Sequence, residues 1–194
     1  MNLPNKITTF RMVLVVVLVA ILLLPFNYGM VGNSSLSWKY LIAFIIFIVA
    51  SISDYFDGHI ARKYNLITTY GKFMDPIADK LLINSSFIIM ATQTPDMVPV
   101  IAVVIMIARD IVVDALRMIS VQKGIVIAAN IFGKLKTVTQ MVALSFVFLA
   151  DWPFSLLGTN GLVAKILCYV AAAISLLSGI IYVVNGKEVF KEDK

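Results

Sequence analysis

Apolar residues occur along this chain in six long runs separated by short polar segments. Each run approaches the ~20 residues that an α-helix needs to cross the hydrocarbon core of a bilayer. Turn-forming segments such as Thr94-Pro95-Asp96 and Asp151-Trp152-Pro153 stand between the runs. The pattern therefore predicts six membrane-spanning helices, over residues 7–26, 38–60, 73–92, 97–119, 132–150 and 162–184.

Composition supports this prediction and excludes other classes of protein. Of the 194 residues, 60% are hydrophobic and only 14% are charged, against roughly 25% charged residues in ordinary soluble domains. An ordinary soluble domain and a disordered chain are both excluded. A single cysteine, Cys168, and a single histidine, His59, exclude a disulfide framework and a metal site built from cysteine or histidine. We expect one all-α membrane-embedded domain over residues 1–194.

The basic residues are distributed unequally between the two ends of the predicted helices. Fourteen of the 16 lysines and arginines lie near one set of ends, and only Lys39 and Lys165 lie near the other. Positive residues mark the cytoplasmic side of membrane proteins. We therefore expect both termini in the cytoplasm, as an even number of spans requires.

Four aspartates gather at the cytoplasmic ends of the second and third predicted helices. They form two helical stripes, because each pair is three or four residues apart, and the short link makes the two helices antiparallel neighbours. Four crowded carboxylates repel one another unless cations intervene, and a ligand set of oxygen atoms alone suits Mg²⁺ or Mn²⁺. Ionisable residues inside a membrane segment are functional candidates. The four are Asp54, Asp57, Asp75 and Asp79.

Small and basic residues complete this predicted centre. Gly58, Ala61 and Gly71 leave room beside the carboxylates for a ligand, and Arg62, one turn beyond Gly58, is a candidate phosphate ligand. A second, basic cluster comprises Arg109, Arg117, Lys134 and Lys136. Together these four side chains are suited to bind the phosphate of a second substrate. We expect the neighbouring Asp110 and Asp114 to pair with the arginines rather than to do chemistry.

The aspartate segment resembles a family signature. Residues 54–62, the next eight residues and residues 71–79 fit D-x-x-D-G-x-x-A-R, eight residues, G-x-x-x-D-x-x-x-D, with all eight specified positions in agreement. This is the pattern of the CDP-alcohol phosphotransferase family. Residues 2–11, 71–80, 108–110 and 133–137 are similar to bacterial members whose acceptor is sn-glycerol 3-phosphate.

The resemblance implies a fold, a reaction and a site. The fold is six transmembrane helices around a cytoplasm-facing polar cavity, usually as a homodimer, in the bacterial cytoplasmic membrane. The reaction moves a phosphatidyl group from CDP-diacylglycerol to sn-glycerol 3-phosphate, giving phosphatidylglycerophosphate and CMP. We expect contact with membrane lipids and no nucleic-acid partner.

The same resemblance assigns roles to individual residues. The four aspartates would hold two Mg²⁺ or Mn²⁺ ions, with Asp79 as the general base, and the basic cluster would bind the acceptor phosphate. The expected CDP-lipid-binding residues are Asn5, Thr8, Gly58, Ala61, Arg62, Thr68 and Gly71.

Several alternatives remain open at the level of sequence. Phosphatidylglycerol, giving cardiolipin, or an inositol phosphate are alternative acceptors. More remote alternatives are a Mg²⁺-dependent membrane prenyltransferase and a divalent-cation transporter. For the dimer, Ser175 and Gly179 form a small-xxx-small pair, which is a candidate helix seam.

Overall fold

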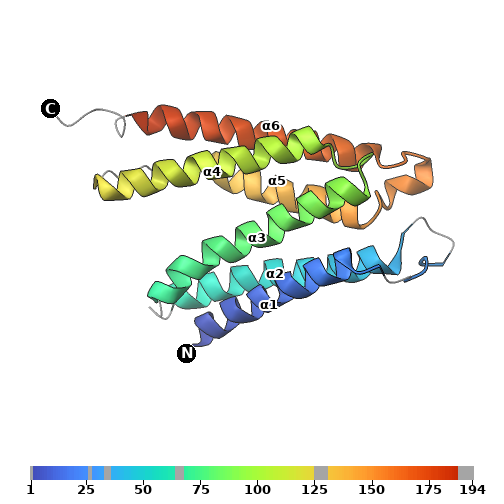
Figure 1. The fold of residues 1–194 in the computed structure, drawn as a ribbon, viewed down its shortest axis with the longest axis horizontal. Coiled ribbons are helices and arrows are strands. Elements are labelled where there is room, and N and C mark those ends of the chain that lie inside the picture. Colours follow the sequence, from blue (N-terminus) through green and yellow to red (C-terminus); the bar gives the residue numbers. More distant parts are fainter. Residues whose placement is uncertain (1, 26–27, 33–35, 64–67, 125–130, 188–194) are drawn as a thin grey trace.

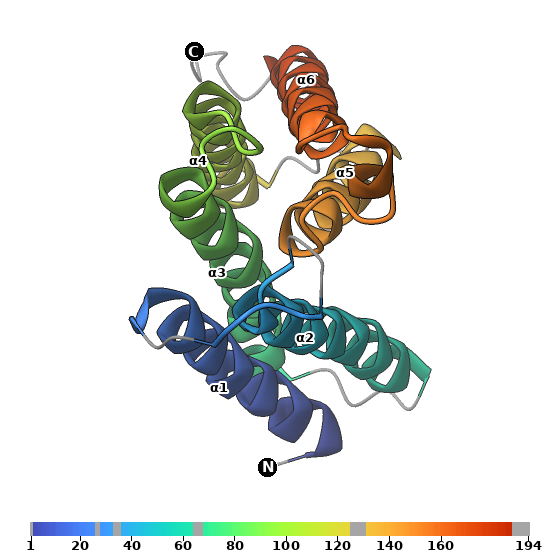
Figure 2. The ribbon, with the colours of Figure 1, turned by 90° about the vertical axis from the view of Figure 1, so that its right-hand side faces the viewer.

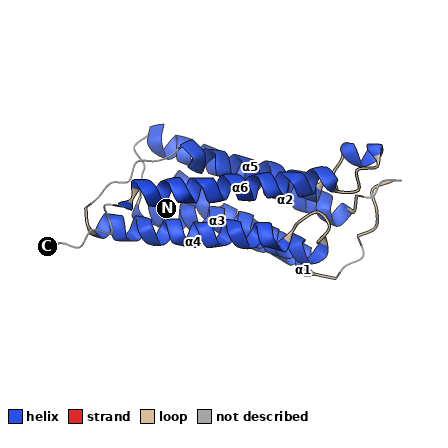
Figure 3. Ribbon diagram, turned by 90° about the horizontal axis from the view of Figure 1, so that it is seen from above, coloured by secondary structure: helices blue, strands red, loops and turns tan. Residues whose placement is uncertain are grey.

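The protein is a bundle of helices. The computed structural model describes residues 2–25, 28–32, 36–63, 68–124 and 131–187, and the side chains at 3–4, 55–63 and 72 lie outside this description. Within these residues there is no β-strand, and all the long elements are helical (Figure 3). The elements are α1 Leu3–Leu23, α2 Trp38–Lys63, α3 Thr69–Gln93, α4 Val100–Gln122, α5 Ile131–Phe148, the short 3₁₀ helix η1 Phe154–Leu157, and α6 Leu162–Asn185.

The six long helices form two groups of three (Figure 2). Helices α1, α2 and α3 pack on one another, and α6 packs on both α4 and α5. Helix α3 also contacts α4 and α5, so it joins the two groups. The start of α1 and the end of α6 lie at the same end of the bundle (Figure 1). This arrangement agrees with the expectation that both termini lie on one side of the membrane.

The six predicted runs match the six helices, but several boundaries differ. Helix α3 begins four residues before the predicted start, because the Thr68 hydroxyl accepts a hydrogen bond from the Gly71 N–H at 3.0 Å and caps the helix. Helix α4 begins at Val100 instead of residue 97, since Pro99 is extended and forms its N-cap. Hydrophobicity alone does not locate such caps.

Specific polar contacts stabilise the end of the bundle that lies opposite the two termini. The Gln93 side chain links three helices: its Nε2 donates to the Leu22 carbonyl at 2.6 Å, and its Oε1 accepts from Lys39 Nζ at 3.1 Å. Asp151 is fully buried and caps α6, because its Oδ1 accepts from the Ala164 N–H at 2.8 Å. These contacts hold the helices together at the end of the bundle opposite the termini.

Apolar side chains cover much of the outer surface as well as the core. Val16 on α1, Ile111 on α4 and Ile180 on α6 are all more than half exposed. Such an exterior is unstable in water and suits contact with lipid. By length and composition, Asn5–Leu23, Ile131–Phe148 and Leu162–Asn185 are able to cross a membrane. Helix α4 carries four charged residues between positions 109 and 117, so it is less apolar than these three.

Candidate active site

One pocket brings together the two clusters that the sequence predicts. It has a volume of about 720 Å³, and its lining residues lie near the starts of α3 and α5 and toward the ends of α4 and α6. Helices α2 to α6 all contribute to its walls. The predicted cluster residues that line it are Asp54, Asp75, Asp79, Arg109, Arg117, Lys134 and Lys136.

The carboxylate wall of the pocket is organised around Arg11, which the sequence reasoning counted only as a marker of topology. The Arg11 Nη1 contacts Asp54 and, at 2.8 Å, Asp79 Oδ1, and its Nη2 contacts Asp75 Oδ1 at 3.3 Å. One guanidinium therefore binds three of the four motif aspartates, which come from two helices. Lys80, which also lines the pocket, pairs with Asp114 on α4.

Arg11 is fully buried. Burying an isolated charge costs several kcal/mol, and the contacts with three carboxylates offset this cost. The sequence does contain a signal for this position. Thr8, Arg11, Val15 and Leu18 are spaced by three or four residues and are all buried, so the polar pair continues the apolar seam of α1. A charged residue within such a seam is a candidate site residue.

Four of the predicted CDP-lipid residues meet beside Asp75. Thr8 Oγ1 donates to Asp75 Oδ1 at 2.8 Å. Thr68 Oγ1 donates to Asn5 Oδ1 at 2.7 Å, and the same hydroxyl caps the start of α3. A Cβ at Gly71 would lie 3.6 Å from both Asn5 Oδ1 and Asp75 Oδ2, so the absence of a side chain there keeps the carboxylate accessible.

The remaining motif positions lie on α2, beyond the side chains that the structure describes. These are Asp57, Gly58, Ala61 and Arg62. Their predicted roles therefore stay predictions. Among the described residues, no group of three or more acidic, histidine or cysteine side chains is arranged to hold a metal ion. Three of the four motif carboxylates, Asp54, Asp75 and Asp79, contact Arg11.

The carboxylates nevertheless fit a divalent cation in their chemistry. They offer oxygen atoms only, which is the ligand type that Mg²⁺ and Mn²⁺ prefer. The guanidinium of Arg11 is itself a cation that three of them already bind. The group is therefore built to bind positive charge.

The basic wall contains a buried ion-pair network. Lys136 Nζ donates to both carboxylate oxygens of Asp110, at 2.6 and 2.8 Å, and Arg109 Nη1 contacts Asp110 Oδ1 at 3.1 Å. Arg109 Nη2 also donates to Ser178 Oγ at 2.7 Å. Asp110 thus pairs with an arginine as predicted. It also holds Arg109 and Lys136 in fixed positions and offsets one of their two charges.

The other two predicted basic residues are exposed. Arg117 lies over the ring of Tyr182, 5.9 Å from its centroid, and has no ion pair within the described part of the chain. Lys134 lies at the start of α5 on the same pocket wall. The prediction that Asp114 pairs with an arginine is wrong, because Asp114 pairs with Lys80 on the facing helix α3.

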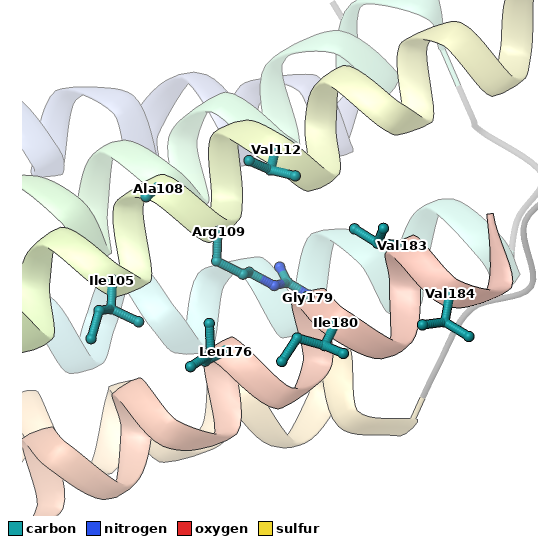
Figure 4. A pocket seen from close by; sticks show the side chains of 9 residues that line it. All are labelled: Ile105, Ala108, Arg109, Val112, Leu176, Gly179, Ile180, Val183 and Val184. Carbon is teal, nitrogen blue, oxygen red and sulfur yellow. The ribbon is translucent and has the colours of Figure 1, made fainter. Parts of the chain in front are cut away.

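An apolar groove of about 410 Å³ lies between α4 and α6, and Arg109 lines both this groove and the charged pocket (Figure 4). The Arg109 stem extends from α4 toward Gly179 of α6 (Figure 4). A Cβ on Gly179 would lie only 2.8 Å from Arg109 Cγ. Ser175 and Gly179 are both buried within this chain, so the small-residue pair packs inside the bundle. The suggestion that it forms a dimer seam is wrong.

An apolar exterior around a charged pocket is typical of an integral membrane protein with polar ligands, and comparison with known proteins identifies the family. The family model of the CDP-alcohol phosphatidyltransferases matches residues 1–177. The chain therefore belongs to this family, as the aspartate signature indicated.

Three relatives illustrate the similarity. All three are named CDP-diacylglycerol–glycerol-3-phosphate 3-phosphatidyltransferase. The protein from Bacillus subtilis is 40% identical over 192 residues, which is 98% of this chain and 97% of the relative. The Rickettsia typhi protein is 34% identical over 181 residues, 93% and 94% of the two chains. The Salmonella typhimurium protein is 35% identical over 147 residues, 75% of each chain.

Proposed function

We propose that this protein is a phosphatidyltransferase that moves a phosphatidyl group from CDP-diacylglycerol to sn-glycerol 3-phosphate. The products are phosphatidylglycerophosphate and CMP. The single observation that carries the proposal is the pocket in which a carboxylate wall and a basic wall face one space. The names of relatives that align over nearly the whole chain support the choice of reaction.

The carboxylate wall is the proposed site of the CDP-lipid diphosphate. Asp54, Asp57, Asp75 and Asp79 would hold two Mg²⁺ or Mn²⁺ ions, which when bound would neutralise the diphosphate and stabilise the CMP leaving group. Asn5, Thr8, Thr68 and Gly71 lie beside Asp75 and are the proposed contacts to the nucleotide, together with Gly58, Ala61 and Arg62.

The basic wall is the proposed site of the acceptor phosphate. Arg117 and Lys134 are exposed and able to bind it directly, and Arg109 and Lys136 extend the positive wall deeper into the pocket. A wall of four cationic side chains favours a small phosphorylated acceptor over a neutral lipid.

The chemical step needs a base and correct positioning. Asp79, at the pocket surface, accepts the proton of the acceptor hydroxyl. The oxygen of that hydroxyl forms a bond to the β-phosphorus of the CDP-lipid. The bond between that phosphorus and the CMP oxygen breaks, and the electron pair leaves with CMP. Most of the rate enhancement comes from positioning and electrostatic stabilisation, as in other phosphoryl transfers.

The proposal includes a place in the cell. Six spans with both termini and the pocket on the cytoplasmic side of a bacterial membrane are supported by the distribution of lysine and arginine. In that orientation the pocket is accessible to water-soluble glycerol 3-phosphate, and the apolar exterior contacts the lipid that contains the other substrate. A homodimer is part of the proposal through the family resemblance.

The direct test is CMP release by the purified protein in detergent, with CDP-diacylglycerol and Mg²⁺ or Mn²⁺. Glycerol 3-phosphate, inositol 1-phosphate and phosphatidylglycerol are offered in separate reactions. We expect metal-dependent release with glycerol 3-phosphate alone. Release with another acceptor would contradict the acceptor assignment and retain the reaction class, and no release from folded protein would contradict both.

A further inference from the structure

Arg11 has a position that the proposed reaction does not explain. Its side chain is fully buried, whereas the side chains of Asp54, Asp75 and Asp79 are 35–40% exposed. The carboxylates therefore lie between the guanidinium and the pocket. A cation that approaches from the pocket therefore meets carboxylates that Arg11 already binds on their buried side.

We infer that Arg11 is a resident counter-ion of the carboxylate site, which competes with divalent ions and makes their full binding depend on the CDP-lipid. The inference rests on the proposed metal site and concerns the regulation of that site. Two cations that share the same carboxylates oppose each other, because like charges a few ångströms apart repel strongly in a poorly solvated place.

The formal charges of the carboxylates, Arg11 and the ions explain why the CDP-lipid would affect metal binding. Four motif carboxylates would neutralise two divalent ions completely if Arg11 were absent. The fixed guanidinium leaves one positive charge in excess, so the second ion is disfavoured. A diphosphate brings two negative charges from the pocket side and removes this excess. Binding of the second ion and of the CDP-lipid are therefore mutually favourable, and this coupling is reciprocal.

Arg11 also stabilises the site itself. Three carboxylates on two helices would repel one another if no cation lay between them. The planar guanidinium is suited to this role because its donors diverge to several acceptors at once, which a lysine ammonium does less well. The contacts of Arg11 thus join the start of α1 to α2 and α3.

The test is a titration of the purified full-length protein with Mn²⁺, followed by electron paramagnetic resonance of the free ion, without and with CDP-diacylglycerol. For the wild type we expect the lipid to tighten Mn²⁺ binding at least about tenfold. Without lipid, Arg11→Gln should bind Mn²⁺ at least about tenfold more tightly than the wild type, and its gain from the lipid should be smaller.

The matched control is Lys6→Gln, which removes the same charge from an exposed position on the same helix. Its Mn²⁺ affinity should stay within about twofold of the wild type, because an exposed charge is screened. Arg11→Lys keeps the charge and should remain closer to the wild type than Arg11→Gln does. If Arg11→Gln does not fold, the comparison of wild type with and without lipid still tests the coupling.

The outcomes separate this inference from the proposed metal site. Mn²⁺ binding to Arg11→Gln that equals or is weaker than binding to the wild type would overturn the inference and leave the metal site in place. Equal Mn²⁺ affinity of the wild type with and without lipid would also overturn it. No Mn²⁺ binding by any of these proteins would overturn the metal site and the inference together.

Discussion

At the scale of single residues, Asp79 has the most demanding proposed role. Its carboxylate lines the pocket and accepts a hydrogen bond from Arg11 at 2.8 Å. A general base typically contributes about 10²–10⁴-fold to a rate. Asp79→Asn keeps the shape of the side chain and removes its ability to accept the proton.

We therefore expect Asp79→Asn to lower turnover at least about 100-fold at saturating Mn²⁺, with CDP-diacylglycerol binding still detectable. Turnover is measured as CMP release, and lipid binding by equilibrium dialysis in detergent micelles. Asp96→Asn, the same substitution in the turn between α3 and α4, is the control and should behave as the wild type. Near-normal turnover of Asp79→Asn would contradict its assignment as the base.

Sequence reasoning identified charged residues of both pocket walls but missed Arg11, which is buried behind the carboxylate wall. Asp54, Asp75 and Asp79 were found because acidic residues at helical spacing are rare in apolar runs. Arg11 was missed because an arginine near a helix end has an ordinary explanation in membrane topology. Only packing shows that its side chain turns inward, between two neighbouring helices, instead of toward the membrane surface.

At the scale of elements, the approach of α4 to α6 depends on Gly179. The Arg109 stem passes so close that a methyl group at this position would overlap with Cγ. Adding a group to such a contact typically costs about 1–3 kcal/mol. The same shift would move the Arg109 guanidinium away from Ser178 Oγ and Asp110.

We expect Gly179→Ala to lower the thermal unfolding midpoint and to raise the KM for glycerol 3-phosphate more than the KM for CDP-diacylglycerol. Gly133→Ala in α5 is the control for stability, because a Cβ there meets no atom within 4 Å. Alanine is intrinsically better than glycine in a helix, so this control should unfold at the same temperature or higher. A Gly179→Ala protein with unchanged unfolding and kinetics would contradict the role of this contact.

The helices were more predictable than their ends. Six apolar runs predicted six helices because a run of this length has few other stable conformations in a membrane. The start of α3 at Thr69 and of α4 at Val100 could not be read from hydrophobicity, since they depend on a threonine hydroxyl and an extended proline. The packing of Gly179 inside the bundle could not be predicted from the sequence either, because a small residue suits contacts within a chain and between chains equally.

At the scale of the whole molecule, the pocket exists because two groups of helices meet. The carboxylate wall comes from α2 and α3, and the basic wall comes from α4 and α5. The rings of Phe47 on α2 and Phe148 on α5, with centroids 5.6 Å apart, pack the two groups together away from the pocket. The sequence predicted each wall from its own helices, and the shared orientation of the charges predicted that the walls would meet.

The proposed division of one pocket between two substrates leads to a specific kinetic expectation. Arg117 is exposed, lines the pocket and lies over the Tyr182 ring, so its guanidinium is accessible to an acceptor phosphate. Within the described part of the chain, it forms no ion pair with the carboxylate wall. Loss of the Arg117 side chain should therefore weaken binding of glycerol 3-phosphate and leave binding of CDP-diacylglycerol unchanged.

The most direct measurement is the pair of KM values of Arg117→Ala for the two substrates, with Lys187→Ala as the control. Lys187 is an exposed cation just beyond α6, at the same end of the bundle. We predict that Arg117→Ala raises the KM for glycerol 3-phosphate at least about tenfold and leaves the KM for CDP-diacylglycerol within about twofold, while Lys187→Ala changes neither. An equal rise in both KM values for Arg117→Ala would contradict a basic wall dedicated to the acceptor.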